Sequence, residues 1–554
     1  MDFYTELQQR FEEKKPAKDE LSRIKLELCS KYGLKKIPTD IEIGQHLSGA
    51  LVSKPSRTLA GVSPVAIMAR PSNCRHGSCI YCPGGLNSVF GDIPKSYTGK
   101  EPATRRAIRN NFDAYLQTMN RLEQYILLGH SPEKAELIIM GGTFPSEDED
   151  YQKKFITEAF QAMNDFSRLF YKDGRFNRQK FREFFEVPSS SHNKERDGRI
   201  NKNMLEQKSA RNASIDEEHA LNEGSNIRCV SLVIETRPDY ATLEIANRLL
   251  ELGVTKIELG VQTIYDDVLK KINRGHDSAE SKKATALLKD LGFKVAYHVM
   301  PGLPGVSKER DIKALKEYAD NEDFRPDMLK IYPCLVLRGT NLYEEWLAGK
   351  FKPISTQEAA DIICEFKKIC PEWIRIMRVQ RDIPTFMTED GVDKTNLRQY
   401  VEKLAMEKGI KCRCIRCREP KTDEHSGEIE YKTAEYQASG GKEFFISAID
   451  VKRGNIVGFC RLRFPSQALR REIANKSSLV RELRVYGKST EIGEIGNVQH
   501  RGIGKRLMAI AEEISLQNGK NKVVVIAGIG AKEYFRKLRY AKEGPYMVKE
   551  IGCG

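Results

Sequence analysis

The chain has 554 residues, more than a single hydrophobic core usually supports, so we expect two or three domains. Its 91 lysines and arginines outnumber its 77 aspartates and glutamates, and the formal net charge is +14. An excess of this size suits a polyanionic partner such as nucleic acid, although a generally charged soluble surface would also produce it.

The first residues, 1–13, are charged and unlike a signal peptide, and no apolar run approaches the about 18 residues of a membrane span. We therefore expect a cytoplasmic protein with no membrane partner. In such a reducing compartment, the 13 cysteines indicate metal and redox chemistry rather than disulfides.

Residues 1–60 are expected to form a basic helical region. Leu21, Ile24 and Leu28 recur at helical spacing, and many lysines and arginines surround them. Two interpretations stay open. The helices could present a solvated charged face, or they could bind the phosphate backbone of an RNA.

Three cysteines, Cys74, Cys79 and Cys82, lie within nine residues directly after an apolar stretch at 65–68. Three thiolates on a cubane 4Fe-4S cluster leave one iron open for an external ligand, which is where S-adenosylmethionine binds in radical enzymes. A structural zinc site is the alternative. It needs four ligands, and His76 could supply the fourth.

From residue 61 to about 400 the chain alternates apolar strands with amphipathic helices. Helices are expected at 241–252 and 279–291, and strands at 65–68, 135–140, 229–235, 256–260, 293–299 and 328–332. Repeated strand-helix units predict an α/β fold with a parallel sheet closed into a partial or full (β/α) barrel. The stretch 166–227 is polar with little apolar periodicity, so we expect an insertion that is at least partly disordered.

Polar residues and glycines follow these strands, where parallel α/β folds build their active sites. Gly141 and Gly142 would let a ligand approach the backbone closely, and Thr143 adds a hydroxyl. Glu235 and Arg237 could bind a ribose or an amino-acid head group, as could Glu258 and Gln262 on the next strand. Singly, each is more often a structural polar residue. Their recurrence at successive strand ends favours a cofactor site.

Residues 401–430 form a cysteine-rich linker, with Cys412, Cys414 and Cys417 spaced as zinc ligands. His425, Cys460 or Cys334 could be the fourth ligand. Free thiols in a reducing cell are the alternative.

The C-terminal part, residues 431–554, is expected to be a second α/β domain. Strands at 444–448 and 456–462 flank the turn residues Gly454 and Asn455. The loop from Gln499 through Gly502, Ile503 and Gly504 to Lys505 opens an amphipathic helix at 506–516. Such a loop presents unpaired backbone N–H groups that suit a pyrophosphate. A strand at 523–527 and then Tyr534 follow it, a setting typical of an acetyl-coenzyme A site.

The two halves together resemble the catalytic subunit of the Elongator complex, a tRNA uridine acetyltransferase family that joins a radical S-adenosylmethionine domain to a GNAT-type acetyltransferase domain. Several segments carry the resemblance, with the numbers 79–85, 96–99, 140–144, 235–240, 273–276, 378–384, 481–483 and 544–549. The resemblance implies carboxymethylation at C5 of the wobble uridine of tRNA. In that family a 5'-deoxyadenosyl radical is thought to abstract hydrogen from the acetyl methyl of acetyl-CoA, and the carbon radical adds to C5. Thioester hydrolysis then leaves the carboxymethyl group.

The resemblance also implies roles for single residues. Cys74, Cys79 and Cys82 would be the iron ligands, and Tyr534 and Phe535 would lie near the thioester. The remaining acetyl-CoA contacts would be Lys134, Glu482, Leu483, Arg484, Val485, Ile503, Gly504 and Lys505. The family usually has a second tyrosine where this chain has Phe535, so one phenolic hydroxyl is missing. Elongator-type partner subunits are a further implication.

Two other functions stay open at this point. A protein lysine acetyltransferase with a purely structural iron-sulfur domain would turn over acetyl-CoA without cleaving S-adenosylmethionine. A tRNA-binding scaffold without turnover would leave the cysteine spacing and the glycine loop without purpose. The three-cysteine loop favours the radical enzyme, because a purely structural cluster uses four protein ligands.

Overall fold

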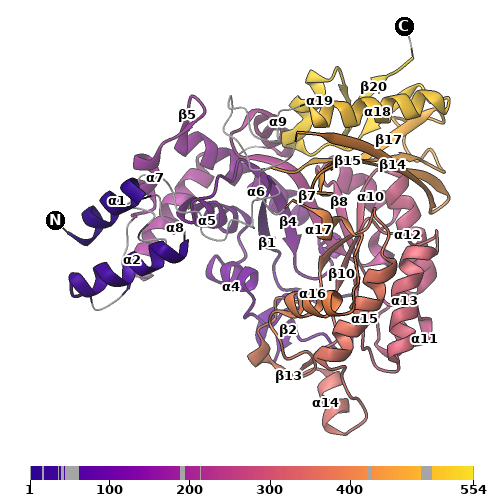
Figure 1. Ribbon diagram of the computed structural model, residues 1–554, viewed down its shortest axis with the longest axis horizontal. Helices are drawn as coiled ribbons and strands as arrows, with labels where there is room; N and C mark the ends of the chain where they lie inside the picture. Colours follow the sequence, from indigo (N-terminus) through magenta and orange to yellow (C-terminus); the bar gives the residue numbers. More distant parts are fainter. Residues whose placement is uncertain are drawn as a thin grey trace.

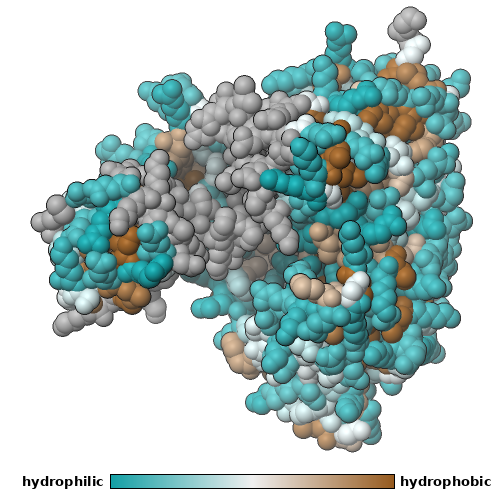
Figure 2. All heavy atoms as spheres, in the orientation of Figure 1, coloured by the Kyte–Doolittle hydropathy of each residue, from teal (hydrophilic) through white to brown (hydrophobic). Residues whose placement is uncertain are grey.

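The computed structural model describes residues 2–14, 18–34, 37–38, 43, 61–187, 194–212, 214–420, 427–487 and 502–552. Figure 1 shows a central domain around a parallel sheet, a C-terminal domain against one end of it, and two N-terminal helices to one side. No helix among these residues is long and apolar enough to cross a membrane. The face drawn in Figure 2 is mostly hydrophilic.

The central sheet is a curled, parallel half-barrel, which confirms the expected fold. Its strand order follows the chain, and every neighbouring pair is parallel. The strands are β1 (Ser63–Met68), β4 (Lys134–Met140), β7 (Arg228–Thr236), β8 (Lys256–Gln262), β9 (Lys294–Val299), β10 (Met328–Ile331) and β12 (Arg375–Arg378). Because all strands run the same way, their carboxyl ends form one rim.

Helices follow most strands and cover the outside of the sheet. They are α4 (Pro102–Arg109), α5 (Ala114–Leu127), α6 (Glu149–Phe170), α10 (Leu243–Glu251), α11 (Asp266–Lys271), α12 (Ser278–Asp290), α13 (Lys308–Asp320), α14 (Asn341–Leu347), α15 (Thr356–Ile369) and α16 (Leu397–Glu407). Local sequence fixes several starts. Asp277 with Glu280 and Ser355 with Glu358 form capping boxes that satisfy the first N–H groups of α12 and α15. The helices expected at 241–252 and 279–291 are confirmed.

Short elements lie at the carboxyl rim. They are β2 (Gly85–Ser88), β3 (Gly91–Ile93), β11 (Val336–Leu337), β13 (Thr388–Asp390), and the 3-10 turns η2 (Phe144–Ser146), η3 (Pro238–Tyr240) and η4 (Thr385–Met387).

The stretch 166–227 differs from the expectation of a partly disordered insertion. Its described residues, which exclude 188–193 and 213, form β5 (Tyr171–Lys172), β6 (Arg175–Phe176), α7 (Arg178–Phe184), α8 (Lys194–Ser209) and α9 (Ile215–Gly224). Packing of aromatic side chains explains why this stretch folds. Phe166 and Phe170, one helical turn apart, pack against Phe181 and Phe185 with ring centroids 5.5–6.4 Å apart. These four rings join the main hydrophobic core.

At the N-terminus, α1 (Phe3–Lys14) and α2 (Lys18–Lys31) pack against each other. The predicted stripe is confirmed, since Leu21, Ile24 and Leu28 are buried against Phe3 and Leu7. The two helices therefore form a small core of their own.

The C-terminal domain is a mixed sheet with the order β14-β15-β16-β17-β18-β20-β19. Its elements are β14 (Ile429–Ala438), β15 (Gly441–Asp450), β16 (Ile456–Phe464), β17 (Ser477–Val485), α18 (Ile503–Gln517), β18 (Lys522–Val525), η5 (Ile529–Ala531), α19 (Lys532–Lys537), β19 (Ala541–Glu543) and β20 (Tyr546–Glu550). The expected hairpin, β15 with β16, is confirmed. β17 and β18 are the parallel pair, and their pairing ends at Val480 and Val525 while β17 continues to Val485. The two strands therefore separate at the carboxyl end of β17.

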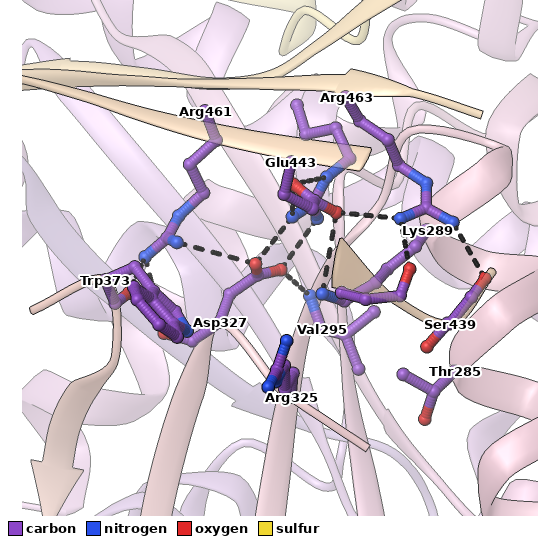
Figure 3. A network of polar contacts seen from close by, with 12 residues as sticks. Thr285, Lys289, Val295, Arg325, Asp327, Trp373, Ser439, Glu443, Arg461 and Arg463 are labelled. Carbon is purple, nitrogen blue, oxygen red and sulfur yellow. Dashed lines mark hydrogen bonds and ion pairs between the residues drawn. The ribbon is translucent and has the colours of Figure 1, made fainter. Parts of the chain in front are cut away.

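One face of this sheet packs on α18, and the other covers the amino-terminal end of the half-barrel (Figure 1). Buried charges join the two domains there (Figure 3). Arg481 of β17 donates to both oxygens of Asp327, at 2.7 and 2.6 Å, and to Glu443 at 2.9 Å. Arg463 of β16 donates to Asp290 at 2.8 Å and to Glu443 at 3.0 Å. Buried ion pairs cost desolvation energy, so this network fixes the register of the domains rather than adding net stability.

Candidate functional site

The cysteine loop lies at the carboxyl rim of the half-barrel, directly after β1. Two tight turns, Gly77 N–H to Cys74 O at 3.1 Å and Cys82 N–H to Cys79 O at 3.0 Å, bend the loop. All three thiols line one cavity of about 870 Å³. Burial raises the pKa of Cys74 and of Cys82, and the negative charge of the neighbouring thiolates raises it further. Their ionisation would therefore be coupled to metal binding.

The separation of the three sulfurs tests the zinc alternative. Within the described ranges, two groups place three candidate ligand atoms within 4.8 Å of one another, and these three cysteines are not among them. Thiolates on one zinc ion, each about 2.3 Å from it, would be closer together. The three cysteines therefore do not form a closed zinc site as they lie in the structure.

Most of the residues predicted at the strand ends line the same cavity. Gly142, Thr143, Glu235 and Arg237 are among its walls. Gly142 has φ +81°, a backbone conformation that is strained for any residue with a side chain. Gly141 does not line the cavity. A Cβ there would lie 3.3 Å from the side chain of Met68, so this glycine allows close packing instead.

Arg237 is already engaged by protein groups. Its Nε and Nη2 donate to the two oxygens of Asp239 at 2.8 and 2.7 Å, and Nη2 also donates to Gly275 O at 2.9 Å. The fork expected to bind a ligand carboxylate therefore holds Asp239, and the residue braces the cavity wall.

A cluster of charged side chains forms the floor of the cavity. Lys330 contacts Glu258 and lies 3.7 Å from Glu235, whose other oxygen accepts from the Tyr97 hydroxyl at 3.2 Å. His298 Nε2 lies 2.9 Å from Glu258. Burial lowers the pKa of His298, so the imidazole is neutral at pH 7. Glu235, Glu258 and His298 lie close enough to hold a metal ion, but the ammonium of Lys330 already provides the cation.

Basic residues line another part of the cavity wall. They are Arg106, Arg109, Arg121, Arg196, Arg378 and Arg381. Burial, followed by repulsion from Arg121 and Arg109, lowers the pKa of Arg106 to about 9. An anion bound beside these guanidinium groups would relieve that repulsion.

In the linker, Cys412, Cys414 and Cys417 have their sulfurs within 4.8 Å of one another. Cys370, at the carboxyl end of α15, is hydrogen-bonded to the thiols of Cys412 and Cys414. Hydrogen bonding with Cys370, and then with Cys417, lowers the pKa of Cys414 to about 7, against the opposite effect of Cys412. Only the three linker thiols form the group within 4.8 Å, and Cys370 is the neighbouring thiol that could complete a tetrahedral Cys₄ zinc site.

The expected fourth ligands lie elsewhere. Cys460 is buried under α18 and Cys334 packs near the cysteine loop, while His425 lies outside the described residues. Cys370 is remote in sequence from the three linker cysteines. Its position shortly before β12 was the one signal in the sequence that could have pointed to it.

The predicted acetyl-CoA residues of β17 and α18 lie near one another at the carboxyl end of β17. Gly502, with φ +80°, begins α18, whose first turn contains Ile503, Gly504 and Lys505. A Cβ on Gly504 would lie 2.6 Å from the Tyr534 hydroxyl and 3.6 Å from Val485. These residues therefore lie beside the point where β17 and β18 separate, and Glu482, Leu483 and Arg484 occupy the same end of β17.

Of the other predicted residues, one is buried, one lies at the junction of the two domains and one is outside the described residues. Phe535 is 5% exposed and packs in the core beneath α18, edge-on to Tyr534, so a hydroxyl at this position would be buried. Lys134 begins β4 opposite Arg228, at the amino-terminal end of the barrel that the C-terminal domain covers. Gln499 lies outside the described residues.

Comparisons with known proteins give one family. The model of the radical SAM superfamily matches residues 200–318, and the radical SAM C-terminal domain matches residues 326–407. A tRNA uridine(34) acetyltransferase of Methanocaldococcus infernus is 46% identical over 519 residues, which are 90% of this chain and 88% of that protein. Human Elongator complex protein 3 is 36% identical over 98% of this chain and 96% of its own length. The chain belongs to the family of tRNA uridine(34) acetyltransferases and Elongator complex protein 3.

The solved archaeal Elp3 of Methanocaldococcus infernus, which lacks its residues 1–46, supports this placement. It superposes with a TM-score of 0.70 at 40% identity, covering 89% of this chain and all of that one. The resemblance inferred from the sequence motifs is therefore confirmed. In this Elongator family member, sequence reasoning missed Cys370, Lys330, His298 and Tyr97. For Lys330 and His298 a signal was available, because each is a polar residue within a largely apolar strand.

Proposed function

We propose that this chain modifies the wobble uridine of tRNA, using acetyl-CoA and radical chemistry to install a carboxymethyl group at C5. The observation that carries the proposal is the loop of Cys74, Cys79 and Cys82, whose three cysteines share one cavity with strand-end polar groups and arginines. The archaeal relative is named for tRNA uridine(34), which supports the choice of substrate.

In this proposal Cys74, Cys79 and Cys82 hold a 4Fe-4S cluster, and Gly142, Thr143 and Glu235 contact S-adenosylmethionine. When bound, the cluster and S-adenosylmethionine supply the radical that abstracts hydrogen. His298, neutral and held by Glu258, can accept a proton within the cavity.

The C-terminal domain would bind acetyl-CoA as a GNAT-type acetyltransferase does. The first N–H groups of α18, after Gly502, have no acceptor within the helix and therefore suit a pyrophosphate. The gap between β17 and β18 would admit the pantetheine arm, with the Tyr534 hydroxyl near the thioester.

Charge supports a tRNA substrate. The arginines along the cavity wall, with Arg106 repelled by its neighbours Arg121 and Arg109, concentrate positive charge that suits the phosphates of an RNA. The net charge of +14 acts in the same direction. All cysteines in the described ranges are free thiols, which supports a cytoplasmic location.

A zinc ion held by Cys370, Cys412, Cys414 and Cys417 is the structural part of the proposal. These cysteines link α15 to α17 (Ile415–Arg418), directly before the C-terminal domain. Closing that loop would fasten the junction between the domains.

The decisive experiment uses anaerobically reconstituted protein with dithionite, S-adenosylmethionine, acetyl-CoA and unmodified tRNA, followed by nucleoside mass spectrometry. We expect 5-carboxymethyluridine and 5'-deoxyadenosine from the wild type and neither from Cys79→Ala. The control Cys229→Ala removes a buried thiol outside the cavity and should keep both products. Acetyl-CoA turnover onto a lysine peptide, without 5'-deoxyadenosine, would replace this proposal with a protein acetyltransferase.

A further inference from the structure

The segment Asn273, Arg274, Gly275 and His276 has no role in the activity described above, yet it contacts most of the cysteine loop. Asn273 Nδ2 donates to Ser78 O at 2.9 Å, and Ile80 N–H donates to Ile272 O at 3.1 Å. A Cβ on Gly275, which has φ +75°, would lie 2.8 Å from the Cβ of His76. This segment therefore supports the cysteine loop from below.

Arg274 brings a permanent positive charge to one thiol of that loop. Its Nη1 donates to Cys79 Sγ at 3.7 Å, and the residue is 8% exposed. An arginine stays charged at any physiological pH. Buried here, its charge is poorly screened by solvent.

The rest of the guanidinium is held by protein groups rather than left free for a ligand. Nε and Nη2 donate to Gly260 O at 3.2 and 2.6 Å, and Nε lies 3.1 Å from His276 Nε2. Gly260 must lack a side chain for this, because a Cβ there would lie 2.3 Å from Nη2. The charge is thus fixed in place beside Cys79.

We propose that Arg274 is a positioning residue that raises the reduction potential of the iron-sulfur cluster through its contact with Cys79. Reduction adds one negative charge to a cluster, and hydrogen bonds and charges near the ligand sulfurs set the potential at which this happens. The inference rests on the proposed function, since it requires the cluster at Cys74, Cys79 and Cys82.

The test measures the cluster without any substrate. Reconstituted wild type, Arg274→Gln and Arg274→Lys are titrated with dithionite and followed by electron paramagnetic resonance. At a fixed potential we expect the ratio of reduced to oxidised cluster to fall about tenfold in Arg274→Gln, equivalent to a midpoint about 59 mV more negative. Arg274→Lys keeps the charge and should stay near the wild type. Arg310→Gln, a partly exposed arginine outside the cavity, is the matched control.

A second variant covers the case in which Arg274→Gln assembles less cluster. Gly260→Ala keeps the arginine but displaces its guanidinium, so its potential should also fall. Unchanged midpoints in both variants, measured on the clusters that do form, would overturn the inference while leaving the proposed function intact. A wild-type chain that forms no 4Fe-4S cluster would instead remove the proposed function and, with it, this inference.

Discussion

At the scale of single residues, the cavity wall combines groups that could face a ligand with groups already held by protein partners. The three cysteines of the loop and the strand-end residues Thr143 and Glu235 do share one cavity, as expected from their placement after strands. Asp239, only two positions from Arg237, occupies that arginine's fork. Such pairing depends on rotamers and burial, which sequence spacing does not encode.

Gly504 should be required for acetyl-CoA binding. A methyl group at this position would meet the Tyr534 hydroxyl at 2.6 Å and push that ring from the end of β17. We expect Gly504→Ala to weaken acetyl-CoA binding about tenfold, as one lost hydrogen bond or contact typically does, measured by isothermal titration calorimetry. Gly198→Ala, at a helical glycine with open space around it, should bind as the wild type does. Equal affinity of both variants would contradict the assigned site.

Asp311 should make stability depend on pH. Burial raises the pKa of this carboxyl from 3.8 to about 7, and its Oδ2 accepts from Gly302 N–H at 2.7 Å. The folded state therefore binds a proton that the unfolded state has lost between about pH 4 and 7, so stability falls as pH rises through this window. At pH 8 the cost is at most about 4 kcal/mol.

Asp311→Asn removes that titration while retaining an acceptor for Gly302. We expect its melting temperature to exceed that of the wild type at pH 8 and the two to converge toward pH 4, as measured by thermal denaturation. A constant difference between the two proteins over this range would show that Asp311 titrates normally.

At the scale of elements, the hydrophobic pattern of the sequence predicted most strands of the half-barrel. Six of the seven half-barrel strands were expected from their apolar runs. β12 was missed because Arg375 and Arg378 bracket only two apolar residues, and its place at the end of the sheet is fixed by pairing with β10. The helices of 166–227 were missed because their apolar residues are a few aromatics in a polar stretch, and only their mutual packing reveals a core.

The linker cysteines should bind one zinc ion per chain. We expect Cys370→Ala to lose that zinc and to lower the melting temperature, because the metal joins α15 to the end of the linker. Cys364→Ala, on the same helix, is the control. Its thiol is buried and donates to Val401 O instead of joining the cluster. Metal content by inductively coupled plasma mass spectrometry decides the point, and full zinc in Cys370→Ala would exclude this cysteine as a ligand.

At the scale of the whole molecule, the two domains should unfold together. Arg481→Met would leave the carboxylates of Asp327 and Glu443 buried without their shared partner. Breaking a buried pair in this way costs about 3–5 kcal/mol. Calorimetry should show a single transition in the wild type and a lower or divided one in the variant. Arg338→Gln, in an exposed pair with Glu389, should change little. Two independent transitions in the wild type would contradict this coupling.

The same contact limits how the family's halves could be exchanged between species. A chimaera that joins the barrel of one relative to the C-terminal sheet of another would bury four or more charges contributed by two different parents. It should fold only where the barrel supplies acids equivalent to Asp290 and Asp327 and the sheet supplies arginines equivalent to Arg463 and Arg481. The barrel and the C-terminal sheet should therefore be exchangeable only as a matched pair.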